Sequence, residues 1–295
     1  MFKVEVDNFI NYLHHEKKYS SHTIRAYNRD LNDFCLFISK ESINSFIELK
    51  KQNIHQFLYF LSVKKYNNRT ISRKLASLKS FFNFLVQTNV LKNNIAKSIS
   101  APKIDKRLPV FLNQDKISLL LDLSKSESLK ESRDILIIEL FYSTGIRISE
   151  LVKIKLEDIN YDKNSINIFG KGNKKRVVII GNYAKKRLLD YLNYMEHTSS
   201  GYLFKKQRKS QNDYISERCV FNVVKKYVAK VTQNEKISPH SLRHTFATHL
   251  LNNGADLVSV KEFLGHSDLS STQIYAHVNI EQMKKAFKKA HPHAK

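Results

Sequence analysis

Residues 238–249 of the chain read Ser-Pro-His-Ser-Leu-Arg-His-Thr-Phe-Ala-Thr-His. Pro239 after Ser238 predicts the start of a helix, because proline suits the first helical position and serine suits the cap. His240 and Arg243 are three residues apart, so they share one face of the first helical turn. A guanidinium and a proton-transferring imidazole beside a helix N-terminus suit a phosphate group.

The same stretch allows two other interpretations. His240 and His244 have the spacing of a zinc-binding helix, but Ser241 stands where a metalloprotease has glutamate, so that interpretation fails. The second is a purely structural helix, in which the histidines form ordinary hydrogen bonds within the fold. For a single histidine taken alone, this structural interpretation is the more common one. The stretch needs support from elsewhere in the chain.

Working outward, residues 263–275 read Phe-Leu-Gly-His-Ser-Asp-Leu-Ser-Ser-Thr-Gln-Ile-Tyr. Gly265 suits the position just after a helix, which would place His266 at the start of a loop. Thr272 suits the cap of a further helix that would carry Tyr275. The chain has 14 tyrosines, and composition alone does not select this one.

Upstream, residues 142–151 read Tyr-Ser-Thr-Gly-Ile-Arg-Ile-Ser-Glu-Leu. Gly145 predicts a break between two helices, and Arg147 would begin the second one. An arginine there can direct its planar donors at a phosphate, with Glu150 three residues later to hold it. The simpler interpretation is an ion pair on a helix surface.

One hairpin interrupts the helical pattern of this region. Residues 165–169 alternate like a strand, residues 170–173 (Gly-Lys-Gly-Asn) predict a turn that carries Lys171, and residues 176–180 predict the returning strand. Helical signals resume from Ala184. A mostly helical domain with a small antiparallel β-sheet is therefore expected.

The first hundred residues contain none of the seven glycines and show four apolar stripes at helical spacing, which predict a four-helix bundle. Pro102 and Pro109 bracket a polar, basic stretch typical of a linker. We therefore expect a helical domain over residues 1–100, a linker over residues 101–109 and a second domain over residues 110–295. The whole chain is expected to be mainly α.

Polar faces of the second and fourth expected helices carry hydroxyl, amide and cationic side chains. Such groups near helix N-termini favour phosphate oxygens, although each one alone also fits a capped helix with a solvated face. The repetition on two helices of a basic domain favours DNA contact. The candidate DNA-binding residues are Thr23, Arg25, Arg69, Thr70, Arg73, Lys74 and Lys79.

Composition narrows the class of protein. The formal net charge is +23, spread over both expected domains, and 42% of residues are hydrophobic. Such an excess indicates a polyanionic partner, nucleic acid before an anionic membrane, although a ribosomal or DNA-coating protein would also have it. Two distant cysteines and the lack of a signal-type or membrane-spanning apolar run predict a cytoplasmic protein without disulfides, metal or membrane.

Together and in this order, these motifs resemble the tyrosine recombinase (phage integrase) family. The resemblance rests on TGIRISEL, GKGNKKR, HSLRHTFATHLLNNGAD and LGHSDLSSTQIYAHV, on the ending AHPHAK, and on SSHTIRAYNRDLNDF and NNRTISRKLASLKSFFNFL near the N-terminus. It covers essentially the whole chain and is strongest for the bacterial XerC/XerD type. It implies an N-terminal SAM-like bundle that binds DNA and a catalytic domain. The residues that match catalytic positions of the family are Arg147, Lys171, His240, Arg243, His266 and Tyr275.

The resemblance also implies a mechanism without ATP, cofactor or metal. Tyr275 would attack the scissile phosphate to form a 3′-phosphotyrosyl link, Arg147 and Arg243 would bind its oxygens, and His266 would donate a further hydrogen bond. Lys171 would protonate the leaving 5′-oxygen, and His240 would act as general acid and base near the tyrosine.

The resemblance further implies the partners. A clamp of the two domains would hold double-stranded DNA at a dif-like site, within a homo- or hetero-tetramer of recombinase protomers. A helix around residues 281–290 would dock onto a neighbouring protomer, and a DNA translocase of the FtsK type would activate the resolution of chromosome or plasmid dimers.

Three alternatives stay open on the sequence. An integrase of a phage or mobile element often has a further N-terminal arm-binding domain; here the sequence begins at the bundle, which favours the Xer type. A type IB topoisomerase would relax supercoils as a monomer. A DNA-binding protein without catalysis would not need the six matched residues.

Overall fold

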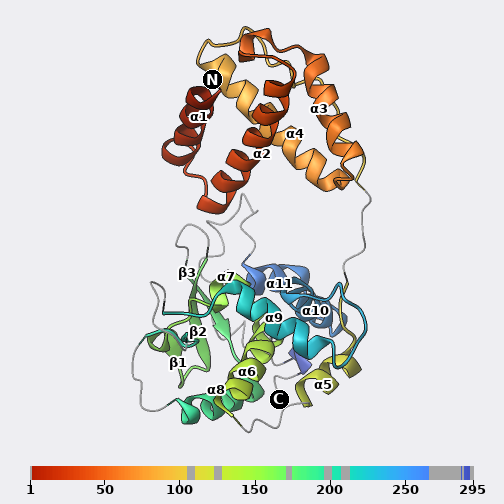
Figure 1. The fold of residues 1–295 in the computed structure, drawn as a ribbon. Helices are drawn as coiled ribbons and strands as arrows, with labels where there is room; N and C mark the ends of the chain where they lie inside the picture. The colour runs from red at the N-terminus through yellow and green to blue at the C-terminus, as the bar shows by residue number, and fades with distance from the viewer. Residues whose placement is uncertain are drawn as a thin grey trace. The chain divides into compact units, whose positions relative to one another are not determined.

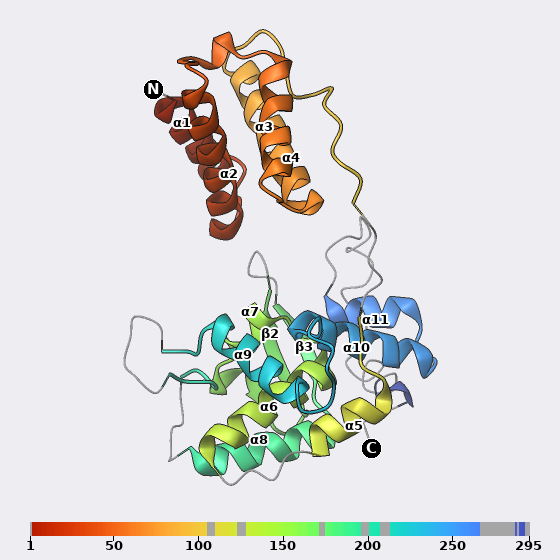
Figure 2. The same ribbon diagram turned by 45° about the vertical axis from the view of Figure 1, so that its right-hand side comes forward.

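The computed structural model describes residues 2–104, 110–122, 128–170, 175–195, 201–206, 213–265, 287 and 289–292. The chain divides into two compact units, Met1–Arg107 and Leu108–Lys295, which Figures 1 and 2 show in two orientations. The fold is mainly α, as the apolar periodicity predicts. In the described part of the chain, every helix is too short or too polar to cross a lipid bilayer.

The first unit is the predicted helical bundle. Its helices are α1 Lys3–His15, α2 Ser21–Lys40, the 3₁₀ turn η1 Phe46–Glu48, α3 Lys51–Val63 and α4 Asn68–Gln87. Each of α2 and α4 begins at a cap: the Ser20 side chain accepts a hydrogen bond from the Thr23 N–H, and the Asn67 side chain accepts one from the Thr70 N–H at 2.8 Å. The caps satisfy amide groups that a helix start would otherwise leave unpaired.

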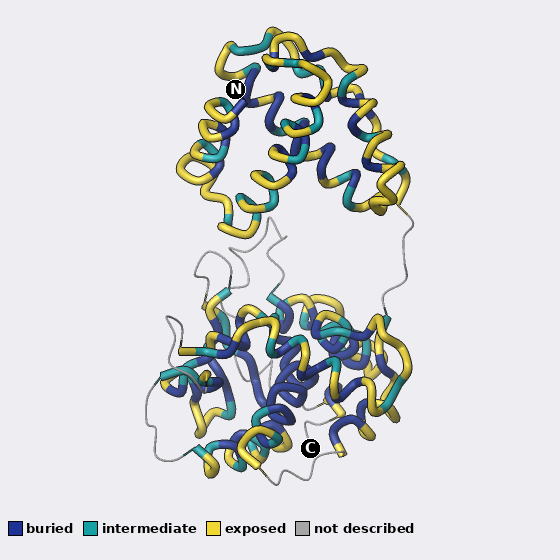
Figure 3. Tube along the Cα trace, in the orientation of Figure 1, coloured by how far each residue is buried: buried dark blue, intermediate teal, exposed yellow. Residues whose placement is uncertain are grey.

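Phenylalanine side chains from α1 to α4 fill the centre of this unit, and Figure 3 shows the buried inner faces of its helices. Phe9 packs edge-on against Phe81 with ring centroids 5.3 Å apart, and Phe34 does so against Phe57 at 5.1 Å. Aromatic edge-to-face pairs add to the free energy gained by burying apolar area. The core therefore joins helices that are distant in sequence.

A buried ionic cluster joins α2 to α4 beside this apolar core. Asp30 is fully buried and accepts hydrogen bonds from the Arg73 guanidinium, from Lys74 Nζ at 3.2 Å and from Ser77 Oγ at 2.8 Å. Lys74 Nζ also lies 2.5 Å from Asp33 Oδ2. Buried charges need such partners, because an unpaired charge would lose its hydration without compensation.

The second unit is mostly helical with one small sheet. Its elements are α5 Gln114–Asp122, α6 Leu129–Thr144, α7 Ile148–Leu151, η2 Leu156–Asp158, β1 Ile159–Asn160, β2 Ser165–Phe169, β3 Lys175–Ile179, α8 Asn182–Tyr194, α9 Glu217–Val228, α10 Pro239–Asn252 and α11 Leu257–Leu264. The order β1-β2-β3 is antiparallel throughout, with Asn167 opposite Val177. The hairpin is as predicted, and β1 is a further short strand.

Helix α6 is the central element of this unit. It packs against α8, α9 and α10, and its side chains from Ile135 to Thr144 are all buried. Because apolar residues surround the helix, it has no polar stripe to reveal it in sequence. Its C-terminal end is therefore held rigidly, and that end leads directly into Gly145 and Arg147.

The described end of the chain packs against this same unit. Phe287 and Ala290 are buried in a cluster with Phe246 and Phe263, and the His291 ring stacks on Phe287 with centroids 4.6 Å apart. The His291 Nε2 atom lies 3.1 Å from the Tyr142 carbonyl oxygen in α6. Residues 281–286 and 288 of the predicted protomer-docking helix lie outside the described residues, and its Phe287 and Ala290 pack against their own chain.

Candidate active site

The end of α6 determines where Arg147 lies. Gly145 has φ +58° and closes the helix in the left-handed conformation, and Arg147 then caps α7. The Arg147 N–H donates to Glu150 Oε2 at 2.9 Å, and Arg147 Nη1 donates to Glu150 Oε1 at 2.9 Å. The Glu150 side chain is only 3% exposed and that of Arg147 is 36% exposed, so the carboxylate of this ion pair is buried and the guanidinium is partly accessible.

Arg243 reaches the same place from α10. Ser238 precedes Pro239 at the helix start, as predicted, and Arg243 follows in the first turns. Its Nη1 donates to the Gly145 carbonyl oxygen, and its Nη2 donates to the Leu264 carbonyl oxygen at 2.5 Å. The structure therefore brings together the two arginines that the motifs single out, although they are far apart in sequence.

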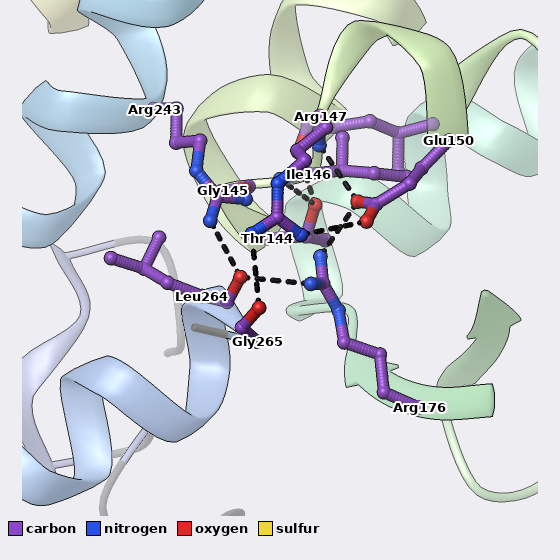
Figure 4. A network of polar contacts seen from close by, with 10 residues as sticks. Thr144, Gly145, Ile146, Arg147, Glu150, Arg176, Arg243, Leu264 and Gly265 are labelled. Atoms are coloured by element: carbon purple, nitrogen blue, oxygen red, sulfur yellow. Dashed lines mark hydrogen bonds and ion pairs between the residues drawn. The ribbon is translucent and has the colours of Figure 1, made fainter. Parts of the chain in front are cut away.

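A third guanidinium completes the cluster, and the motifs did not predict it. Arg176 on β3 donates from Nη2 to Glu150 Oε2 and from Nη1 to the Leu264 carbonyl oxygen, both at 2.8 Å. Figure 4 shows Arg147, Arg176 and Arg243 converging on Glu150 and on the C-terminal end of α11. The sequence signal available was a pair of basic residues, Lys175 and Arg176, at the start of an otherwise apolar strand.

The cluster has more positive charge than its carboxylate can balance. Burial, followed by the nearby Arg147 and Arg176 guanidinium groups, lowers the pKa of Arg243 to about 9, while Glu150 acts in the opposite direction. Burial also lowers the pKa of Arg176, an effect that Glu150 opposes and Arg147 adds to. Three guanidinium groups therefore meet beside one carboxylate, so the site carries unbalanced positive charge suited to an anion.

Gly265 sits directly over the Arg176 side chain. Its φ of +60° closes α11 as predicted, and a Cβ atom on it would lie 2.2 Å from Arg176 Nη1. Arg147 Nη2 donates to the Gly265 carbonyl oxygen at 2.9 Å. The guanidinium groups thus approach this backbone turn closely because no side chain stands there.

The other candidate catalytic residues divide into two groups. His240 is exposed on the first turn of α10, the turn that leads to Arg243. Lys171, His266 and Tyr275 lie outside the described residues. The described part of the site is therefore an arginine cluster with one imidazole on the adjoining helical turn.

Buried charge in the first unit corrects one candidate DNA contact. Lys74 is 2% exposed and its ammonium group binds Asp30 and Asp33, so it is not available to a phosphate. Arg73 shares Asp30, although 45% of its side chain is exposed. The predicted contact at Lys74 is wrong because the residue lies on the buried face of α4.

The remaining candidate DNA contacts lie at the surface or partly below it. Arg25 and Arg69 are exposed, whereas Thr23, Thr70 and Lys79 are partly buried. The Thr23 hydroxyl lies 2.9 Å from the Ser20 hydroxyl, and Arg25 Nε donates to the Ser21 carbonyl oxygen at 3.3 Å. Local partners therefore already hold some of these groups.

Sequence comparison places this arrangement in a family. Residues 110–282 match the phage integrase family, and residues 6–89 match the phage integrase N-terminal SAM-like domain. The chain belongs to the phage integrase family of tyrosine recombinases. It is 39% identical over 293 residues to tyrosine recombinase XerC of Listeria welshimeri, with 97% of each chain covered. It is 38% identical over 294 residues to XerC of Bacillus pumilus, covering 97% of this chain and 95% of that one.

Solved structures of tyrosine recombinases share the fold. One is the XerH recombinase bound to a palindromic difH substrate, with TM-score 0.71, 23% identity, and coverage of 96% of this chain and 83% of that one. Another is the Tn1549 transposon integrase in complex with transposon right end DNA, with TM-score 0.69, 18% identity, and coverage of 96% and 98%. As a tyrosine recombinase, the chain is an enzyme that breaks and rejoins DNA with a tyrosine as nucleophile.

Proposed function

We propose that this tyrosine recombinase resolves chromosome or plasmid dimers at a dif-like DNA site. The observation that carries the proposal is the convergence of Arg147 and Arg243 at one point with unbalanced positive charge. A phosphodiester under attack gains negative charge, and fixed guanidinium groups stabilise that charge in the transition state. The similarity to XerC proteins over 97% of the chain supports the dif-like site.

The proposed reaction conserves the number of phosphodiester-type bonds. The Tyr275 oxygen bonds to the scissile phosphorus and the bond from phosphorus to the 5′-oxygen breaks. Lys171 gives a proton to that leaving oxygen, and His240 takes the tyrosine proton as general base. Attack by another 5′-hydroxyl reverses these steps and releases Tyr275, so no external energy source enters.

Binding of the phosphate involves the described residues most directly. Arg147 and Arg243 have donors on backbone carbonyl oxygens of Gly145, Leu264 and Gly265. Phosphate oxygens are stronger acceptors because they are charged, so they replace those carbonyls when DNA binds. His266 adds one more donor to the same phosphate.

The proposed assembly is four protomers on two DNA sites, either all of this chain or with a second recombinase. The first unit contacts the DNA backbone through Thr23, Arg25, Arg69, Thr70 and Lys79. Arg73 contacts the same backbone while its guanidinium also binds Asp30. We propose that the stretch around residues 281–290 also docks onto a neighbouring protomer, with its Phe287 and Ala290 buried in their own chain. A DNA translocase of the FtsK type would time the reaction. We propose that the protein works in the cytoplasm, where the thiols of Cys35 and Cys219 would stay reduced.

A suicide substrate tests the proposal. Such a duplex carries a candidate dif-like site with a nick near the scissile phosphate, so that the cut fragment diffuses away and the covalent adduct accumulates. The wild-type protein should form an adduct stable to denaturant, and Tyr275→Phe should form none while its DNA affinity stays within about twofold. Covalent adduct from Tyr275→Phe would refute the assignment of the nucleophile.

A second assay separates the proposal from its rivals. Supercoil relaxation without preference for a site would favour a type IB topoisomerase, and integration into a non-homologous target would favour an integrase. The integrase alternative has less support, because the XerC relatives named above match at 38% and 39% identity. Recombination between two dif-like sites on one plasmid is the outcome that we expect.

A further inference from the structure

The structure assigns to Arg176 the role of a positioning residue that holds the two phosphate-binding arginines of this site in place through Glu150 and the end of α11. This inference rests on the proposed function, because it concerns how the same site is organised. Arg176 is the last residue of the GKGNKKR motif, in which the resemblance assigns a role to Lys171 alone. Its contacts differ in kind from those of Arg243, and its side chain is more deeply buried than that of Arg147.

The first observation is what each guanidinium binds. Within the described residues, Arg243 donates to two backbone carbonyl oxygens, those of Gly145 and Leu264. Arg176 instead joins the Glu150 carboxylate, at 2.8 Å, to the Leu264 carbonyl oxygen, at 2.8 Å. A neutral carbonyl is readily exchanged for a phosphate oxygen, whereas a buried carboxylate is not. The contact of Arg176 with Glu150 is therefore suited to persist when DNA binds, as is that of Arg147, whereas Arg243 can exchange both of its carbonyl partners.

The second observation is exposure. The Arg176 side chain is 16% exposed, against 36% for Arg147. Glu150 is 3% exposed and receives both Arg147 and Arg176, one on each side. Because Glu150 Oε2 also accepts the Arg147 N–H, Arg176 completes the set of donors that fixes this carboxylate. The carboxylate in turn fixes the direction of the Arg147 guanidinium.

The third observation is the fit beneath the turn after α11. A Cβ atom at Gly265 would lie 2.2 Å from Arg176 Nη1 and 2.9 Å from Arg176 Cδ, so the side chain fills the space under the glycine. The Leu264 carbonyl oxygen accepts from Arg176 and from Arg243. Arg176 therefore links β3 and α7 to the α11 end, where His266 of the proposed site follows directly in the chain.

Loss of Arg176 should leave the fold intact but misplace the site. Arg176 and Arg147 both lower the pKa of Arg243, which means that the three cations repel one another in the free protein. Replacing Arg176 by glutamine removes part of that repulsion, and Glu150 keeps its two contacts with Arg147. The free protein then loses one link between Glu150 and Leu264 without leaving an isolated buried charge.

Single-turnover cleavage of the suicide substrate by the full chain tests this role. We expect Arg176→Gln to slow adduct formation at least tenfold, with DNA affinity within about twofold of wild type. Arg176→Lys should recover part of the rate, because its single cation can still pair with Glu150. Lys186→Gln is the matched control: it removes one charge from an exposed position on α8 and should leave the rate unchanged.

The salt dependence of DNA binding separates positioning from direct contact. A residue that neutralises a phosphate contributes a slope of roughly 0.9 in log K against log salt. Arg176→Gln should keep the wild-type slope, whereas Arg243→Gln should lower it by about 0.9. A loss of that size with Arg176→Gln would overturn the positioning role, and so would a wild-type rate of cleavage.

A double-mutant cycle covers the case in which Arg176→Gln does not fold. If Arg176 acts through Glu150, the effect of Arg176→Lys on the rate should largely disappear in the Glu150→Gln background. Multiplicative effects of the two changes would overturn the inference. If the wild-type chain forms no adduct, the proposed function fails; if it does and the Arg176 variants cleave like wild type, only the present inference fails.

Discussion

Replacement of Lys74 by methionine distinguishes a structural lysine from a DNA contact. Removing one partner of a buried ion pair costs about 3–5 kcal/mol, because it leaves the other charge desolvated. Here Asp30 keeps Arg73 and Ser77 as donors, so we expect a loss at or below the lower limit of that range, about 2–3 kcal/mol. Methionine matches the length of the lysine stem, which limits the loss from packing.

The first unit should show nearly all of this loss. For a domain of 60–100 residues, each kcal/mol lowers the melting temperature by about 4–8 °C, which gives a drop of roughly 10–20 °C. Calorimetry of the full chain measures the drop, and hydrogen exchange of peptides from α2 and α4 assigns it to this unit. The second unit should melt as in the wild type.

DNA binding should be unaffected by Lys74→Met, in contrast to stability. Lys74→Met should leave the salt slope of DNA affinity unchanged at a temperature where the unit is folded. Arg69→Gln, at an exposed position near the start of α4, should reduce the slope by about 0.9 and change stability by less than about 0.5 kcal/mol. A reduced slope in Lys74→Met with an unchanged melting temperature would refute the structural role of this lysine.

Three further outcomes concern the second unit. Gly145→Ala should lower stability by about 2–4 kcal/mol, since φ is +58° and the new Cβ would lie 2.5 Å from Phe246 Cδ1; thermal melting measures it, and a change below about 0.5 kcal/mol would contradict the fit. Gly265→Ala should displace Arg176 and slow adduct formation at least tenfold while the protein still binds DNA, and a wild-type rate would contradict the close approach of these residues. Burial lowers the pKa of His249, although a hydrogen bond to the Leu112 backbone opposes this, so the unfolded chain takes up a proton first as pH falls. Stability should therefore be full above about pH 6.5 and fall below it, and His249→Asn, which cannot titrate, should flatten that decline in melting curves recorded between about pH 7.5 and about pH 5.

The spacing of apolar residues and the positions of proline and glycine were enough to predict most of the helices. Apolar spacing predicted α1 to α4, and Pro239 and Gly265 predicted the ends of α10 and α11. These signals are local, because a cap or a left-handed turn depends on a few neighbouring residues. The same local logic predicted the ion pair of Arg147 with Glu150.

Arg176 escaped prediction because its importance is not local. It lies 29 positions after Arg147, and only the path of the sheet brings its side chain to Glu150. The alternation of apolar and polar residues that predicts a strand does not indicate which basic side chain of that strand reaches the end of a neighbouring helix. The two-stranded pattern predicted the pairing of β2 with β3 but not what the returning strand contributes.

Lys74 was misassigned although a signal was present. It falls within the spacing of Ile71, Leu75 and Leu78, so it lies on the buried face of α4 and not on the polar one. Asp30 occupies a similar place on α2, directly before Leu31. Two opposite charges on two apolar stripes predict a buried pair, and charge alone gave the wrong assignment.

The backbone carbonyl oxygens that Arg147 and Arg243 bind in the free protein also make the site select between small anions and long DNA. A free phosphate or sulfate ion must displace the carbonyls of Gly145, Leu264 and Gly265, and it forms no contacts outside the arginine cluster to offset that cost. A polymer brings many further backbone contacts to the same protein, and these offset the displacement. The enzyme should therefore remain insensitive to millimolar inorganic anions while still responding to one phosphate within a long duplex.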